Sequence, residues 1–181
     1  AVMARLLAAK TDVVTIIGTG LQGYMSLLCM SKVLDMKEIR VCDISEAAMD
    51  RFIARFPDAP FRFVKCKSNE EGCRGSDVII TVTNANADLV EEPWVKPGAL
   101  VMTMGSFRET SFDVVRKADR IAVDQVGQSL HRGNVKELAE MGVDAIIADS
   151  FQSCVCCHTL SLRKAVWPFS LWIRLLSSFR S

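Results

Sequence analysis

The sequence predicts an α/β protein whose mainly parallel sheet is covered by helices on both faces. Short apolar segments alternate with longer amphipathic ones, as in 13–17 followed by 21–35. A glycine-rich turn at 18–23 joins these two segments, and an acidic residue ends the next apolar segment, 38–43. This combination is typical of a Rossmann-type, doubly wound sheet.

The same alternation continues along the chain and divides it into three parts. Residues 1–11 are predicted as the end of a lead-in helix, 12–149 as the Rossmann domain, and 150–181 as an atypical tail. Ser45 is the predicted N-cap of the second helix of the domain. The predicted strands are 13–17, 38–43, 61–65, 77–83, 99–104 and 120–124, and the predicted helices are 21–35, 45–56, 111–117 and 127–141.

The turn at 18–23 has the glycine spacing of a phosphate-binding loop. Gly18 allows a sharp turn out of the strand, and Gly20 lacks the Cβ that would hold the backbone away from a pyrophosphate. Gly23 lets the following helix pack close to the strand, and this helix directs unpaired N–H groups at the phosphates. The predicted cofactor-binding residues of this turn are Gly18, Thr19, Gly20, Leu21, Gln22 and Gly23.

Asp43 closes the second predicted strand, twenty residues beyond Gly23. At this distance an acid accepts hydrogen bonds from the adenine-side ribose of a dinucleotide. Its charge would repel a 2′-phosphate, so NAD is the expected cofactor and NADP is disfavoured. An isolated acid here would be read as a turn residue, but the preceding glycines favour the ribose role.

Two further strand ends are predicted to approach the cofactor. Thr81 and Thr83 end one strand at the carboxyl edge of the sheet, where ligands of open α/β sheets bind. Both residues are equally well explained as ordinary β-branched strand formers. Gly105 and Ser106 end the next strand, and Gly105 would let the backbone approach the nicotinamide ring.

Composition excludes several other classes of function. The net charge is +1 and the first 150 residues contain no basic face, so we expect no nucleic-acid partner. Seven cysteines, an odd number, argue against a disulfide framework and for a reducing, cytoplasmic setting. No signal peptide is visible and no segment is long and apolar enough to cross a bilayer, so no membrane partner is expected.

The tail, 150–181, has no Asp or Glu, and three interpretations of it are open. The cluster Cys154-Val155-Cys156-Cys157-His158 could hold a metal, but it lacks the spaced pairs of a structural zinc site, so we assign no metal ligand. A basic segment from Arg163 to Arg180 could lie on a membrane surface, although Pro168 interrupts it. The abrupt loss of acids favours the third interpretation, a shifted reading frame or aberrant end.

The motifs, in order, resemble ornithine cyclodeaminase and its relatives, the mu-crystallin-type reductases. The resemblance covers residues 1 to about 145 and includes VTIIGTGLQG at 14–23 and VDQVGQSLHRG at 123–133. The matching segments are 1–10, 14–23, 41–43, 76–83, 94–98, 104–107 and 123–133.

The resemblance implies NAD(P)-dependent chemistry at the Cα of an amino acid or cyclic imine. In that family the cyclodeaminase converts ornithine to proline and ammonia, and the reductases reduce a cyclic imine. A second domain, built from the N-terminal part and the extreme C-terminus, dimerises and supplies most substrate contacts. The implied partners are a small-molecule amino acid or imine and, in a full-length form, a second copy of the chain.

Two departures from the family pattern bear on function. The N-terminal region that holds the substrate carboxylate is absent, so we expect an incomplete chain. Phe107 stands where the cyclodeaminase has a proton-handling aspartate, which favours a reductase or dehydrogenase relative. Glu109 or Asp113 could replace that aspartate only if the loop alignment shifts, so no catalytic residue is assigned. The alternatives are a non-catalytic NAD(P)H-binding protein and an inactive fragment.

Overall fold

A computed structural model describes residues 1–105, 107–123, 136, 147–149 and 171–174, and its centre is a mainly parallel sheet. The described strands are ordered β3-β2-β1-β4-β5-β8-β6-β7. The expected α/β fold with a doubly wound sheet is therefore confirmed. The strands are β1 (Val13–Ile17), β2 (Glu38–Cys42), β3 (Arg62–Lys65), β4 (Val78–Thr81), β5 (Leu100–Thr103), β6 (Arg120–Val123), β7 (Ile147–Asp149) and β8 (Leu171–Arg174).

The strand order reverses between β1 and β4. The chain first moves outward from β1 through β2 to β3, and then returns to pair β4 with the other side of β1. All of these pairings are parallel, so the carboxyl ends of β1, β2 and β4 meet at one edge. This reversal is the switch point at which open α/β sheets bind ligands.

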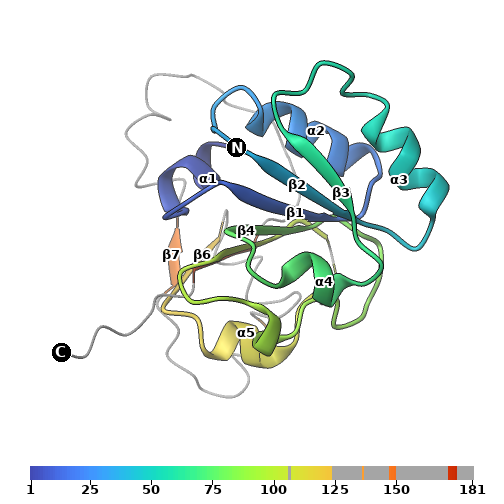
Figure 1. Ribbon diagram of the computed structural model, residues 1–181. Coiled ribbons are helices and arrows are strands. Elements are labelled where there is room, and N and C mark those ends of the chain that lie inside the picture. The colour runs from blue at the N-terminus through green and yellow to red at the C-terminus, as the bar shows by residue number, and fades with distance from the viewer. Residues whose placement is uncertain (106, 124–135, 137–146, 150–170, 175–181) are drawn as a thin grey trace, which may run out of the picture.

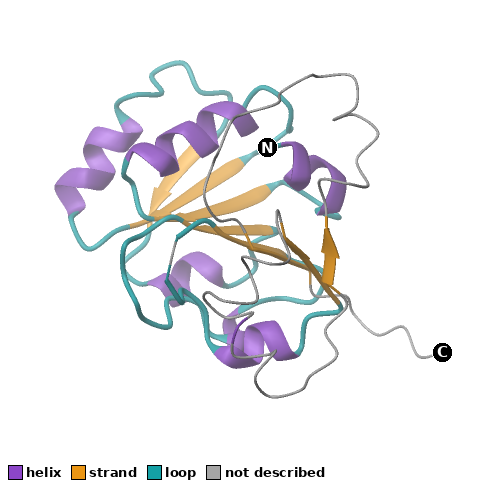
Figure 2. Ribbon diagram, turned by 180° about the vertical axis from the view of Figure 1, so that it is seen from behind, coloured by secondary structure: helices purple, strands orange, loops and turns teal. Residues whose placement is uncertain are grey.

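Helices cover both faces of the sheet. In Figure 1 the helices α1, α2 and α3 lie above the sheet and α4 and α5 lie below it, and Figure 2 shows the same layers from behind. The helices are α1 (Val2–Leu7), α2 (Leu21–Met30), α3 (Glu46–Ile53), α4 (Asn69–Cys73) and α5 (Phe112–Arg116), with a short 3₁₀ helix, η1 (Glu92–Trp94).

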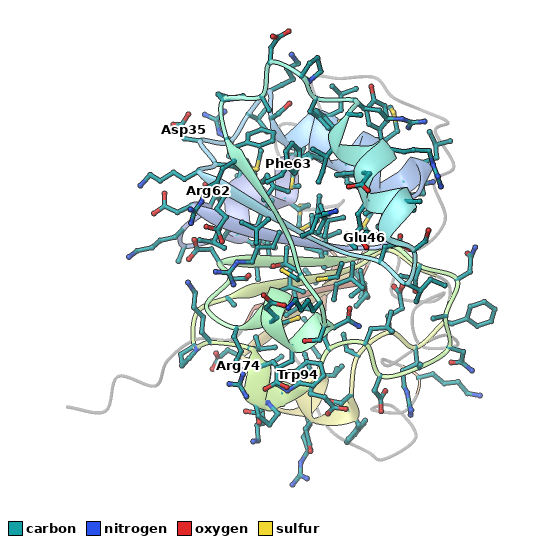
Figure 3. The ribbon with its side chains drawn as sticks, turned by 45° about the vertical axis from the view of Figure 1, so that its right-hand side comes forward. Asp35, Glu46, Arg62, Phe63, Arg74 and Trp94 are labelled. Atoms are coloured by element: carbon teal, nitrogen blue, oxygen red, sulfur yellow. The ribbon has the colours of Figure 1, made fainter. Side chains whose placement is uncertain are left out.

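Alternating side chains of the central strands build two cores, one on each face. Ile16 and Ile80 pack with the first three helices, whereas Ile17 and Ile79 pack with the layer of α4 and α5. Figure 3 shows Phe63 of β3 directed at the layer of α2 and α3. Because both faces are covered, the strands are apolar on both sides, which is why they could be recognised in the sequence.

Most predicted elements of the domain lie within a few residues of their expected bounds. Ser45 caps α3 as predicted, since its side chain accepts the Ala48 N–H at 3.3 Å. The helix expected over 21–35 was too long, because it ends at Met30. There the Ser31 hydroxyl donates to the Leu28 carbonyl at 2.8 Å, and the chain turns toward β2.

Other elements were not predicted. The short helix α4 and the strands β7 and β8 had no expected counterpart, and β8 comes from the 150–181 tail. It pairs antiparallel with both β5 and β6. The helix expected over 127–141 and the Cys154–His158 cluster lie outside the described residues. Within the described part of the chain, no helix has the length and apolar character needed to cross a membrane.

Asp77 joins the starts of β1 and β4. Its carboxylate accepts the Val13 N–H at 2.9 Å and pairs with the Lys96 ammonium at 2.6 Å. Burial raises the pKa of Asp77, but the Lys96 and Val13 hydrogen bonds outweigh burial and hold this pKa below its ordinary value.

We expect Asp77→Asn to lower the free energy of unfolding at pH 7 by about 1–2 kcal/mol, because half-exposed Lys96 loses its charged partner. The stabilisation by a carboxylate with a lowered pKa is complete above its unfolded pKa and disappears as the pH falls through the folded pKa. Urea unfolding of the variant should therefore depend less on pH below about 4 than that of the wild type.

Asp12→Asn is the matched control, since Asp12 pairs with Lys37 in an exposed ion pair. Its effect should stay below about 1 kcal/mol. Equal effects of the two variants, or parallel acid profiles of Asp77→Asn and wild type, would contradict this role of Asp77.

Candidate functional site

A groove of about 790 Å³ lies at the edge where β1, β2 and β4 end. The turn after β1 contributes Gly18 and Gly20, the end of β2 contributes Asp43, and the end of β4 leads to Thr83, which also lines the groove. The sequence predicted all four of these residues as cofactor contacts. The topology brings them together because parallel strands end at the same edge.

The three glycines of the turn have different environments. Gly18 has φ +101°, and a Cβ at this residue would lie 2.6 Å from the Val82 carbonyl oxygen. A Cβ on Gly23 would lie 2.3 Å from the Gly18 carbonyl oxygen, so these two glycines are required by the packing of the protein itself. A Cβ on Gly20 would meet no atom within 4 Å, so the space in front of Gly20 is open.

Asp43 is fixed at the end of β2 by the turn after β1. Its Oδ2 accepts the Thr19 N–H at 2.8 Å and the Thr19 hydroxyl at 2.7 Å, and its Oδ1 accepts the Ser45 N–H at 3.0 Å. Burial raises the pKa of Asp43, but these hydrogen bonds outweigh burial and hold the pKa below its ordinary value. Asp43 is therefore a carboxylate with a fixed orientation at neutral pH.

Glu109 lies at the ends of β4 and β5 and is fully buried. Its Oε1 accepts the Thr83 N–H at 2.8 Å and the Thr83 hydroxyl at 2.7 Å. Its Oε2 accepts the Thr81 hydroxyl and the Gly105 N–H, both at 2.9 Å. A Cβ on Gly105 would lie 2.5 Å from the Glu109 carboxyl carbon, so a side chain at this residue would displace the Glu109 carboxylate.

These contacts change what the threonines and Gly105 can do. Thr81 is fully buried and its hydroxyl is bonded to Glu109, which leaves Thr83 as the threonine that lines the groove. The predicted cofactor contacts of Thr81, Thr83 and Gly105 stay predictions. Of the two acids considered as replacements for the missing aspartate, Glu109 is enclosed, whereas Asp113 is exposed on α5.

The remaining predicted residues lie around the start of α2. Thr19 is bonded to Asp43, and Leu21 and Gln22 are exposed in the first turn of α2. Ser106 lies outside the described residues. Phe107, at the position of the missing aspartate, is about half exposed.

One wall of the groove was not predicted from the sequence. This wall is formed by Ile44, which is fully exposed, and by residues 66–69 after β3. The exposure of Ile44 is not visible in the sequence, and single exposed apolar side chains are common on protein surfaces, so this residue gave no signal. Residues 66–69 gave no signal, because their place depends on β3 pairing with β2.

The strand order and the glycine turn at the switch point define a Rossmann-type domain. The chain belongs to the ornithine cyclodeaminase/mu-crystallin family, which it matches over residues 1–153. The resemblance seen in the motifs is thereby confirmed.

Individual relatives agree with this assignment. The chain is 32% identical over 147 residues to the ornithine cyclodeaminase of Brucella abortus biovar 1, covering 77% of this chain and 41% of that protein. It is 32% identical over 112 residues to the ketimine reductase mu-crystallin of Mus musculus, covering 60% and 35%. A solved archaeal alanine dehydrogenase dimer with bound NAD has a TM-score of 0.68 and 26% identity, covering 78% and 45%. The chain thus spans less than half the length of these relatives.

The different environments of the glycines lead to a prediction about folding. We expect Gly23→Ala to lower the free energy of unfolding by about 2–3 kcal/mol, because the new Cβ collides with backbone. We expect Gly20→Ala to change it by less than about 1 kcal/mol, since the space is open and φ is −73°. Urea unfolding measures both, and equal losses would contradict the distinction between a packing glycine and a ligand-facing one.

Proposed function

We propose that the groove binds NAD(H) and that this chain is the cofactor-binding part of a family member acting at the Cα of an amino acid or cyclic imine. The observation that carries the proposal is that the open space at Gly20 and the fixed Asp43 carboxylate lie together at the switch point. The archaeal alanine dehydrogenase that shares this fold was solved with NAD bound, which supports the choice of cofactor.

The residues present fit such a cofactor. Gly20 is the N-cap of α2 and makes no side-chain cap, so N–H groups of the first turn are available for a pyrophosphate. Asp43 can accept from ribose hydroxyls and would repel a 2′-phosphate, so NAD(H) is favoured over NADP(H). Leu21 and Gln22, exposed at the start of α2, would flank the pyrophosphate.

The bound nicotinamide would accept or deliver a hydride at the substrate Cα. The role of this chain would be to bind and orient the cofactor. Phe107 replaces the aspartate that the resemblance implies for cyclodeamination, so imine reduction or amino-acid dehydrogenation is favoured over the conversion of ornithine to proline and ammonia. In the whole protein, a second domain and a partner subunit would complete the substrate site, with 12–149 as the cofactor domain.

The second candidate is a protein that binds NAD(P)H without turnover. The enclosed Glu109 favours it, because Glu109 cannot take over the proton transfer assigned to the missing aspartate. An enzyme would interconvert NAD⁺ and NADH with an amino acid or imine, or release ammonia. A binding protein, or an inactive fragment, would do neither. Either protein would work in the expected cytoplasmic setting.

Titration with NADH, followed by nicotinamide fluorescence, tests the proposal on the 181-residue chain. We expect saturable binding by the wild type and weaker binding of NADPH. Asp43→Ala should weaken NADH binding by about tenfold or more, because hydrogen bonds to a charged acceptor are lost. Asp43→Ala should also reduce the preference for NADH over NADPH.

Asp35→Ala is the matched control, since it removes the same charge from an exposed position. In Figure 3, Asp35 lies on the opposite side of the molecule from Glu46, which follows Asp43 closely in the chain. The control should bind NADH like the wild type. Unchanged NADH and NADPH affinities in Asp43→Ala, or no binding by the wild type, would overturn the proposal.

A further inference from the structure

The groove has a buried negative charge behind one end that cofactor binding does not explain. Glu109 is fully buried, and the groups that donate to its two oxygens are N–H and hydroxyl groups of Thr81, Thr83 and Gly105. All of these donors are neutral. They hold the carboxylate in place, and among the described residues none of its hydrogen-bond donors carries a positive charge.

This charge lies close to the groove. Thr83 donates two hydrogen bonds to Glu109 and also lines the groove, so a single residue separates the carboxylate from the cavity. The Thr83 hydroxyl also accepts the N–H of Ala85, another groove residue, at 3.1 Å. Glu109 therefore sets the backbone position of this wall.

The end of the groove that lies near Glu109 is the end opposite Asp43. The sheet places β4 on one side of β1 and β2 on the other. A dinucleotide that lies across a switch point has its adenine half at the end of β2, near Asp43, and its nicotinamide half at the end of β4. Thr83, with Glu109 behind it, belongs to the nicotinamide half.

The two redox states of nicotinamide differ in charge. The ring of NAD⁺ carries a positive charge, and the ring of NADH is neutral. A fixed negative charge behind the ring attracts only the oxidised form. ADP-ribose, which has no nicotinamide, would not be affected.

We propose that Glu109 is a positioning residue whose buried charge, held through Thr83 and Gly105, shifts the groove toward NAD⁺ relative to NADH. The inference rests on the proposed function, because it requires that the groove bind the dinucleotide. Two unit charges roughly 8 Å apart change an affinity by about twofold in a water-like medium and by about thirtyfold at an effective dielectric constant of about 20.

The test measures dissociation constants of NAD⁺, NADH and ADP-ribose by calorimetry on the 181-residue chain. In Glu109→Gln we expect NAD⁺ binding to weaken at least about threefold more than NADH binding. ADP-ribose affinity should stay within about twofold of the wild type. Asp113→Asn, which removes an exposed acid, should leave the three constants unchanged.

A purely structural role would weaken NAD⁺ and NADH equally, and that result would overturn the inference while leaving the proposed function intact. Loss of ADP-ribose binding by Glu109→Gln would indicate that this variant does not fold. In that case the double variant Glu109→Met with Thr81→Val is measured, because it removes the same charge with apolar replacements. An unchanged ratio of NAD⁺ to NADH affinity in that variant would equally overturn it. Failure of the wild type to bind any of the three ligands would instead refute the proposed function, and this inference with it.

Discussion

The turn after β1 has no room for a side chain at Gly18 or at Gly23, and the geometry of the groove depends on this constraint. A Cβ on Gly18 would meet the backbone after β4, and a Cβ on Gly23 would meet the Gly18 backbone. Because the turn is held this tightly, α2 begins at the sheet edge and the Thr19 N–H reaches Asp43. Gly20, which lies between these two glycines in the chain, faces open space.

Two buried or half-buried carboxylates organise the two ends of the groove differently. Asp43 lines the groove and is oriented by Thr19 and Ser45, so its charge is available to a ligand. Glu109 lies behind the wall and uses its described hydrogen bonds to join the ends of β4 and β5. In the proposed function, Asp43 would contact the ligand directly, whereas Glu109 would act on it through the wall and through its charge.

The sequence was sufficient for elements whose signal is local. Strand β1 is an apolar run before glycines, and α3 begins at a serine that caps it, so both were predicted closely. The glycine turn and Asp43 could be placed for a similar reason, since each follows a recognisable apolar strand and parallel strands end at one edge. The end of α2 at Met30 was missed because it depends on a turn in an otherwise helix-compatible segment.

Features that depend on distant contacts were not predictable. Glu109 follows a loop and resembles a solvated acid in the sequence, yet it is buried because Thr81 and Thr83 supply donors from another strand. The groove wall at 66–69 depends on β3 lying beside β2. Strand β8 pairs with β5 across a large sequence separation, and its own residues contain no turn or glycine signal.

A crystal structure of the 181-residue chain grown with NADH tests the central claim most directly. We expect a dinucleotide across the switch point, with its pyrophosphate against Gly20 and a ribose hydroxyl within hydrogen-bond distance of the Asp43 carboxylate. A dinucleotide bound elsewhere, or in the groove with its ribose away from Asp43, would contradict the account.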